Sequence, residues 1–316
     1  MSGFNKVRYI TVLPEQAGQR IDNFLIRELK GVPKSRIYRI LRKGEVRVNK
    51  SRTKPSYKLQ GGDSVRIPPI NMASSESAGV AAESAKAIEQ SVIHEDKHWI
   101  GLDKPAGMAV HGGSGLSFGV IEALRTARPD APYLELVHRL DRGTSGCLLI
   151  AKRRSALRRA HEALREHEAE KEYFVFTRPG WREDKQIINE PLLLSNRRNG
   201  ERHVEVHPDG KPAVSEFRLV QRYKSGDLLR VKILTGRTHQ IRVHAASVGC
   251  PVAGDDRYGD DSYNQKLKQR GLTRLFLHAS SLRLVLEDDE EIHIHAPLPD
   301  MLNDFLRGLE LKRGRV

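Results

Sequence analysis

The stretch VHRLDRGTSG, residues 137–146, places one acid between two arginines on a glycine-containing bend. The acid is Asp141, and Arg139 and Arg142 flank it. An opposite charge within about 4–6 Å keeps a carboxylate ionised, which suits a nucleophile or a general base. The glycines allow a tight turn and the close approach of another backbone. A structural ion pair on a turn has the same features, so this stretch alone leaves both interpretations open.

Two later stretches add side chains that could share a site with Asp141. KEYFVF contains Tyr173, which can stack on a nucleic-acid base and handle a proton, although it could equally be an ordinary strand aromatic. TGRTHQIRVH gathers five polar side chains at the expected start of a helix: Arg237, His239, Gln240, Arg242 and His244. Polar residues concentrated at the end of an element are typical of a functional site.

Metal binding is the alternative interpretation of the two histidines. His239 and His244 are five positions apart, whereas a helical metal pair needs a spacing of four, and no cysteine or paired acid lies beside them. We therefore predict no metal site. The sequence also contains no nucleotide-binding motif, and we expect no cofactor.

The charge of the chain indicates its class of partner. Its 316 residues include 54 Lys and Arg against 40 Asp and Glu, a net charge of +14. Such an excess favours a polyanionic partner, and nucleic acid is the one we predict. No run of 18 or more apolar residues and no secretory segment is present, so we expect no membrane association. The two cysteines form no framework, which favours a reduced, cytoplasmic chain.

Residues 19–70 have the pattern of a small α+β module. QRIDNFLIREL predicts one helix, and PKSRIYRILRKG predicts a second that begins near Pro33 and ends before Gly44. Short alternating strands follow. The second helix carries five basic residues outside its apolar face: Lys34, Arg36, Arg39, Arg42 and Lys43. These residues could contact a phosphate backbone, or they could simply form a solvated face.

The rest of the chain predicts a linker and a larger domain. Residues 71–91 carry no aromatics and few large apolar residues, and we expect a flexible linker there, in part helical. Residues 92–316 alternate between strands and a few helices without a regular βαβ repeat. This order favours an α+β domain built on a large mixed, mainly antiparallel sheet.

The first module resembles the S4 RNA-binding module, in RIDNFL and SRIYRILRKGEVRVN. The larger domain resembles the RluA family of pseudouridine synthases, in EDKHWIGLDKPAGMAVHGG, HRLDRGTSGCLLIAK, KEYFVF and TGRTHQIRVH. Together these motifs cover residues 19–300 almost continuously. VHGGSGLSFGVIE and DDRYGD point to one branch of that family, which modifies several uridines of 23S rRNA.

The resemblance implies a role for each candidate. It makes Asp141 the catalytic aspartate, Tyr173 the active-site tyrosine and Arg242 the basic partner of Asp141. It implies that Arg139 enters the RNA beside a flipped uridine, and we assign further RNA contacts to Arg237 and His239. Arg142 then supports the loop. The variants RGTSGC and NRRNGERH depart from the family pattern without touching an implied catalytic position.

Several alternatives stay open. Asp141 could attack C1′ of the uridine or remove the C2′ proton to give a glycal. An RNA-binding ribosome-assembly factor without the chemistry would share the charge and the S4-like module, but would not need an Asp, Tyr and Arg set. A hydrolase lacks a second carboxylate at a recognisable spacing. The target uridines and the choice between naked rRNA and an assembling particle are not encoded visibly, and a monomer is expected.

Overall fold

The computed structural model of the chain describes residues 6–29, 32, 34–70, 75–112, 119–166, 168–196, 202–287 and 290–312. They divide into two compact units, one formed mainly by residues up to Ala81 and the other mainly by residues from Ala82. Each unit has its own buried apolar core. No described helix is long and apolar enough to cross a membrane.

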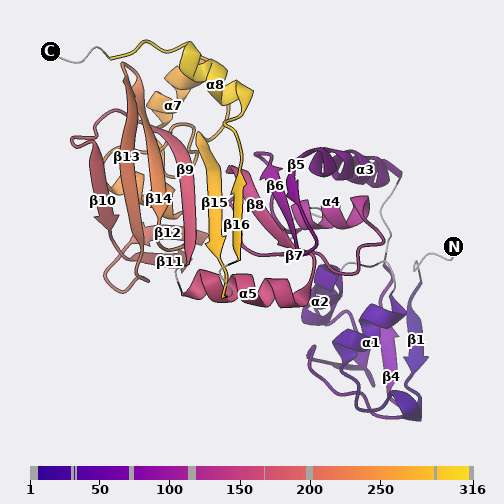
Figure 1. Cartoon of the computed structure of the whole chain (residues 1–316). Coiled ribbons are helices and arrows are strands. Elements are labelled where there is room, and N and C mark those ends of the chain that lie inside the picture. Colours follow the sequence, from indigo (N-terminus) through magenta and orange to yellow (C-terminus); the bar gives the residue numbers. More distant parts are fainter. Residues whose placement is uncertain are drawn as a thin grey trace. The chain divides into compact units, whose positions relative to one another are not determined.

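The first unit is a helical layer packed on one face of a four-stranded antiparallel sheet in the order β1-β4-β2-β3 (Figure 1). Its elements are β1 (Arg8–Thr11), the 3-10 helix η1 (Pro14–Gln16), α1 (Ile21–Glu28), α2 (Lys34–Arg42), β2 (Arg47–Val48), β3 (Ser51–Arg52) and β4 (Ser64–Ile67). Phe24 and Leu25 of α1 and Ile37 of α2 are fully buried in its core. The expected α+β module is confirmed, and β1 extends it before residue 19.

The segment expected to be a flexible linker, in part helical, is helical over most of its described length. Residues 75–90 form helix α3 (Ser75–Gln90), and Ile88 is fully buried in the core of the second unit with Ala85 also buried. The helix forms because the segment is rich in alanine and glutamate, which have high helix propensity. The buried side chain of Ile88 anchors the C-terminal end of the helix to that core.

The second unit is built on a ten-stranded sheet with the main order β10-β13-β14-β9-β15-β8-β6-β5. Strands β7 and β16 pair with β8 and β15, and every pairing is antiparallel except that of β15 with β8. The strands are β5 (Val92–Glu95), β6 (Trp99–Lys104), β7 (Glu135–Leu136), β8 (Ser145–Ala151), β9 (Ala169–Thr177), β10 (Lys185–Asn189), β13 (Val214–Tyr223), β14 (Gly226–Ile233), β15 (Leu277–Val285) and β16 (Glu291–His295). The predicted mixed, mainly antiparallel sheet is confirmed.

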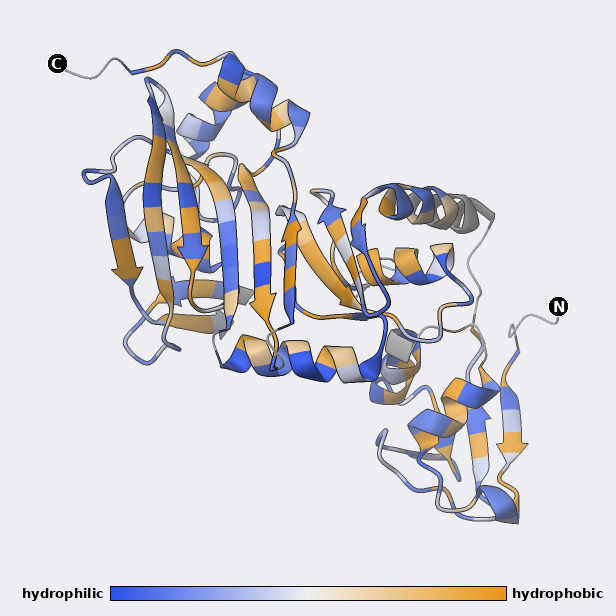
Figure 2. Cartoon of the chain, in the orientation of Figure 1, coloured by the Kyte–Doolittle hydropathy of each residue, from blue (hydrophilic) through white to orange (hydrophobic). Residues whose placement is uncertain are grey.

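Burial explains the composition of the central strands. Every residue of β8 is buried, and its sequence SGCLLIA is a continuous apolar run of the kind found in strands covered on both faces (Figure 2). Helix α5 (Arg154–Arg165) contacts β8 and β15 and buries Ala156, Ala160 and Ala163. The remaining elements are α4 (Val120–Ala127), the hairpin of β11 (Leu192–Asn196) and β12 (Arg202–Val206), α6 (Gln240–Ser247), α7 (Asp261–Lys268) and α8 (Asp300–Arg307).

This topology brings the candidate residues together. Asp141 lies on the loop between β7 and β8, Tyr173 lies on β9, and α6 follows β14 along the chain. Because β14, β9, β15 and β8 are consecutive in the sheet, segments far apart in sequence meet at one place on it.

Gly146 provides a test of this packing. Its φ is +107°, and a Cβ at this position would lie 2.1 Å from the carbonyl oxygen of Ala279 on β15. We expect Gly146→Ala to lower the free energy of unfolding by about 3 kcal/mol or more, because it adds backbone strain and forces the strands apart. Gly271→Ala is the control, since Gly271 has a φ of +97° but open space around it. Equal losses in urea unfolding would contradict the close-approach argument.

Candidate active site

The loop that carries Asp141 is held by its own apolar residues and by a turn. Val137 and Leu140 are buried in the core, whereas the Asp141 side chain is partly exposed. The Thr144 amide donates to the Asp141 carbonyl at 3.1 Å. The two anchors therefore fix the backbone while the carboxylate faces outward.

Arg142 of this loop and Lys104 at the end of β6 tie the loop to the segment around Gly107. The Arg142 Nε donates to the Gly107 carbonyl at 2.8 Å, and the Gly107 amide returns a bond of 2.8 Å to Arg142. The fully buried Lys104 Nζ donates to the carbonyls of Pro105 and Met108 at 2.8 Å and contacts that of Arg142 at 3.4 Å. The expectation that Arg142 supports the loop is confirmed.

Arg242 is held by a buried carboxylate that also orders its surroundings. Its Nε and Nη2 donate to the two oxygens of Asp255, each at 2.7 Å. The same carboxylate accepts the amides of Arg257 and Tyr258 at 2.9 and 3.0 Å. Burial opposes a charge on Arg242, but the hydrogen bonds and charge of Asp255 outweigh it and raise the arginine pKa. This leaves Nη1 directed at Asp141, 3.7 Å from its Oδ2.

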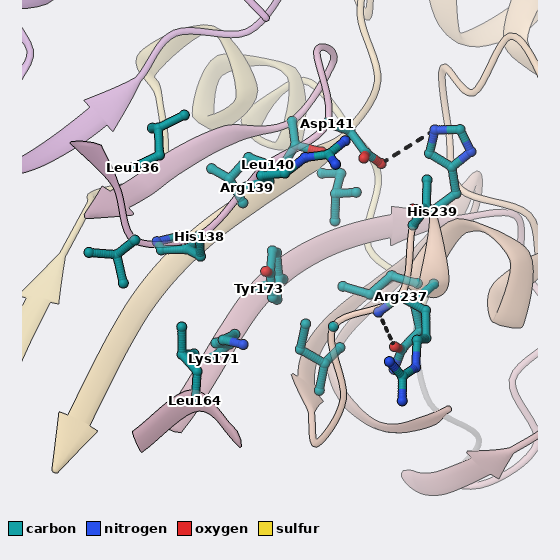
Figure 3. Close-up of a pocket in the computed structure, with 18 of the residues that line it drawn as sticks. Leu136, His138, Arg139, Leu140, Asp141, Leu164, Lys171, Tyr173, Arg237 and His239 are labelled. Atoms are coloured by element: carbon teal, nitrogen blue, oxygen red, sulfur yellow. Dashed lines mark hydrogen bonds and ion pairs between the residues drawn. The ribbon is translucent and has the colours of Figure 1, made fainter. Parts of the chain in front are cut away.

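His239 contacts Asp141 from a second direction (Figure 3). Its Nε2 lies 3.9 Å from Asp141 Oδ2, and its Nδ1 lies 2.8 Å from the Tyr258 hydroxyl. Burial lowers the pKa of His239, so the ring is neutral near pH 7. The sequence predicted His239 at the start of a helix; α6 begins at Gln240, and His239 is its N-cap, with a left-handed φ of 56°. Positive φ in a non-glycine residue is uncommon and clusters at functional sites.

A pocket of about 540 Å³ opens between these residues, within the range of small-ligand sites. Asp141, His239 and Arg242 line it together with Tyr173. Tyr173 is only 7% exposed, and burial raises the pKa of its hydroxyl, so it is neutral. The exposed Arg139 and Arg237 also line the pocket. Exposed arginines that can bind a phosphate, together with a buried tyrosine that can stack on a base, suit a nucleotide.

Two members of the TGRTHQIRVH cluster serve the fold instead. Gln240 accepts from the Thr235 hydroxyl and the Arg237 amide, and its Nε2 donates to the Val214 carbonyl. His244 is fully buried between the Ser215 hydroxyl and the Glu190 carbonyl. Among the described residues, no three His, Cys, Asp or Glu side chains gather as metal ligands would.

The first unit presents a basic face on α2. Arg39, Arg42 and Lys43 are exposed and Arg36 is half-buried, while the side chain of Lys34 lies outside the described residues. Lys43 is 3.9 Å from Glu45, a weak surface pair. The exposed side chains of Arg39 and Arg42 are available to a polyanion.

The outer face of the four-stranded sheet carries a second basic feature, which the sequence did not reveal. Strand register places Tyr9, Arg66, Arg47 and Arg52 directly opposite one another in a row. The neighbouring Val48 and Val65 point into the core. Like charges directly opposite on a sheet are destabilising. In the described part of the chain, no carboxylate pairs with these three arginines.

The sequence interpretation missed Asp255, Tyr258 and Lys104 as parts of the site. Asp255 and Tyr258 lie in the stretch DDRYGD and Lys104 in LDKP. The sequence signal available for these three was a charged or polar residue in an otherwise apolar or glycine-containing stretch. Such a signal does not identify the residue that it will contact in the fold.

Comparisons with known proteins agree with this geometry. The family model described as RNA pseudouridylate synthase matches residues 98–247, and the S4 domain model matches residues 19–65. The ribosomal large subunit pseudouridine synthase C of Pasteurella multocida is 51% identical over 98% of this chain and 95% of the relative. The protein of the same name from Escherichia coli K12 is 51% identical over 97% of this chain and 98% of the relative. The solved human RNA pseudouridylate synthase domain containing 4, with a TM-score of 0.61 and 24% identity over 75% of this chain and all of that one, shares the fold.

The chain therefore belongs to the RNA pseudouridylate synthase family, and the protein is an isomerase. The two bacterial relatives carry the name ribosomal large subunit pseudouridine synthase, and this chain also matches the S4 domain model.

The buried ion pair can be tested with two neighbouring aspartates. Asp255→Asn should lower the free energy of unfolding by about 3–5 kcal/mol, because it leaves a buried guanidinium without its counter-charge. It should also reduce turnover, since Arg242 is no longer held against Asp141. Asp256 lies 3.5 Å from Arg242 but is 96% exposed, so Asp256→Asn is the control and should cost less than about 1 kcal/mol. Similar unfolding curves for both variants would exclude this role for Asp255.

Lys104 predicts a pH dependence of stability. Burial lowers its pKa from 10.5 to about 7 in the folded chain. Between these values the unfolded chain holds a proton that the folded chain has released, so the free energy of unfolding rises with pH over that window. Lys104→Met should flatten the rise. Urea unfolding of both proteins from about pH 7 to 10 measures the difference, and parallel profiles would show that Lys104 does not titrate there.

Proposed function

We propose that the protein isomerises specific uridines of large-subunit, 23S rRNA to pseudouridine, with Asp141 as nucleophile or base and the target uridine flipped into the pocket. The observation that supports this most directly is the Asp141 carboxylate, 3.7 Å from a guanidinium that is itself anchored, at the mouth of a pocket lined by a buried tyrosine. The names of the relatives supply the substrate class.

Each member of the site has a proposed role. Asp141 attacks C1′ or takes the C2′ proton, so that the N1–C1′ bond breaks. Arg242 keeps the carboxylate charged as the base excludes water, because an unpaired carboxylate in a dry pocket is costly. Tyr173 stacks on the uracil while it turns. Arg139, exposed at the rim, fills the space left by the flipped nucleotide, and contacts of this kind offset an unstacking cost of a few kcal/mol.

The remaining parts supply RNA affinity. We propose that residues 19–70 form the RNA-binding module and residues 92–316 the catalytic domain. We further propose that RNA is contacted by α2, by the arginine row formed by Arg47, Arg52 and Arg66, and by the rim residues Arg237 and His239. We propose that the protein acts on rRNA in the cytoplasm, as a monomer, either on naked rRNA or on an assembling subunit.

The function is tested on unmodified 23S rRNA transcript. After incubation with the protein, carbodiimide mapping should show new reverse-transcription stops at a small number of uridines, with no release of free uracil. Tight binding without stops, also on precursor particles, would favour an assembly factor. Release of free uracil would instead indicate a hydrolase.

The basic face of α2 makes a separate prediction. Arg39→Gln combined with Arg42→Gln should weaken rRNA binding and reduce the slope of log affinity against log salt by about 2, because fewer counterions are released. The control is Lys266→Gln combined with Lys268→Gln, two exposed lysines on α7. Arg47→Gln combined with Arg52→Gln tests the arginine row in the same titration. Unchanged slopes for both arginine pairs would remove the first unit from the interface.

A further inference from the structure

Lys171 lies on the wall of the active-site pocket, apart from the Asp141 and Arg242 pair. It is two positions before Tyr173 on β9, so both side chains project from the same face of the sheet, and both line the pocket (Figure 3). The backbone of Lys171 is paired on both sides, with Ile233 of β14 and Leu282 of β15. Its position is therefore as rigid as that of the tyrosine.

The ammonium group of Lys171 has no partner among the residues that the structure describes. Glu170 and Glu172 adjoin it in sequence but project from the opposite face, where they pair with Lys232 and Arg230. His138, also in the pocket wall, is not a counter-ion. Burial lowers its pKa to about 3, and its Nε2 accepts the Leu149 amide at 3.1 Å.

An unpaired cation in a partly buried site is costly. Burial lowers the pKa of Lys171, and no neighbouring anion offsets that effect. Lys104 shows the contrast, because three carbonyl oxygens surround its buried ammonium group. Buried charges in proteins are normally paired. A cation left open towards a ligand pocket indicates that the ligand supplies the negative charge.

The proposed reaction produces such a charge. When the N1–C1′ bond breaks, its electron pair stays on the uracil, and the charge spreads from N1 to O2 and O4. Asp141 and Lys171 lie on opposite sides of Tyr173 in the pocket (Figure 3). With C1′ at Asp141 and the ring against Tyr173, the ring edge remote from the sugar faces Lys171.

The symmetry of uracil keeps an oxygen at that edge throughout. C4, which carries O4, is directly across the ring from N1, and C2, which carries O2, is directly across from C5. Turning the ring about its N3–C6 axis exchanges N1 with C5 and O4 with O2. Resting on the function proposed above, we propose that Lys171 Nζ donates a hydrogen bond to the uracil oxygen remote from C1′, O4 before the turn and O2 after it, and so stabilises the detached uracil anion.

The step balances without a co-reactant. The uracil leaves with the electron pair of N1–C1′ and returns that charge as C5 bonds to C1′. C5 then loses its proton and N1 gains one, so the product is an isomer of the substrate. In the proposed step Lys171 gives up no proton and acts only as a fixed hydrogen-bond donor.

The test compares Lys171→Met with the wild type and with Lys232→Met, a matched lysine on the adjacent strand that pairs with Glu170 on the opposite face. Single-turnover rates are measured with saturating enzyme on an rRNA fragment containing a target uridine. Loss of one donor to a developing anion should slow Lys171→Met by about 100-fold or more, with RNA affinity unchanged. Its melting temperature should not fall, because the substitution removes an unpaired buried cation.

Chemical rescue separates a donor from a structural lysine. Lys171→Ala leaves space in the pocket, and methylammonium should raise its rate by about 10-fold or more, whereas tetramethylammonium, which has no N–H, should not. Turnover of Lys171→Met within about threefold of the wild type would overturn the proposal. The proposal would also be overturned if Lys171→Met and Lys171→Ala both lost melting temperature together with rate, and methylammonium did not restore the rate of Lys171→Ala. The wild-type rate in the same assay tests the proposed function independently.

Discussion

The site depends on the pairing of Arg242 with Asp255. A guanidinium buried this far cannot remain charged alone, and Asp255 meets it with two bonds of 2.7 Å while accepting two backbone amides of its own. This arrangement uses two of the three guanidinium nitrogens and leaves the third for Asp141 at 3.7 Å. In the proposed mechanism, this longer separation leaves the Asp141 carboxylate free to react. A direct bidentate pair with Asp141 would hold it more tightly and make it a poorer nucleophile or base.

The second constraint is the loop that presents Asp141. Lys104 and Arg142 tie it to the segment around Gly107, and Gly146 lets β8 approach β15 closely just after it. The polar groups that hold the loop are thus satisfied within the protein, while the side chains of Asp141 and Arg139 line the pocket. Precision of this kind is what catalysis by a positioned group requires. The pocket then combines Asp141 and Arg242 at one end with Lys171 at the other, which has no partner among the described residues. This arrangement fits the proposed reaction, in which negative charge moves from a side chain to a leaving base.

Part of this could be predicted from sequence. The alternation and apolar runs of residues 92–316 indicated the large mixed sheet, and the acid between two arginines indicated the loop of Asp141. Asp255 could not be identified, because the partner of a buried arginine is set by tertiary contacts and not by local spacing. His239 was expected within a helix that in fact begins one residue later, at Gln240. A histidine gives no sequence signal that it adopts the left-handed N-cap conformation. Helix α3 was expected only as part of a linker, because the buried residues in its described part, Ala85 and Ile88, give a weak sequence signal. The arginine row depends on strand register, which the short strands do not reveal.

The most direct test of the central claim is the single-turnover rate of Asp141→Asn on a defined 23S rRNA fragment, measured beside RNA affinity and melting temperature. Asparagine keeps the size of the side chain but cannot act as nucleophile or base. The variant should form no detectable pseudouridine, with RNA affinity and melting temperature close to those of the wild type. Residual turnover above a few per cent of the wild-type rate would contradict it, because the reaction would then proceed without the carboxylate on which the whole site converges.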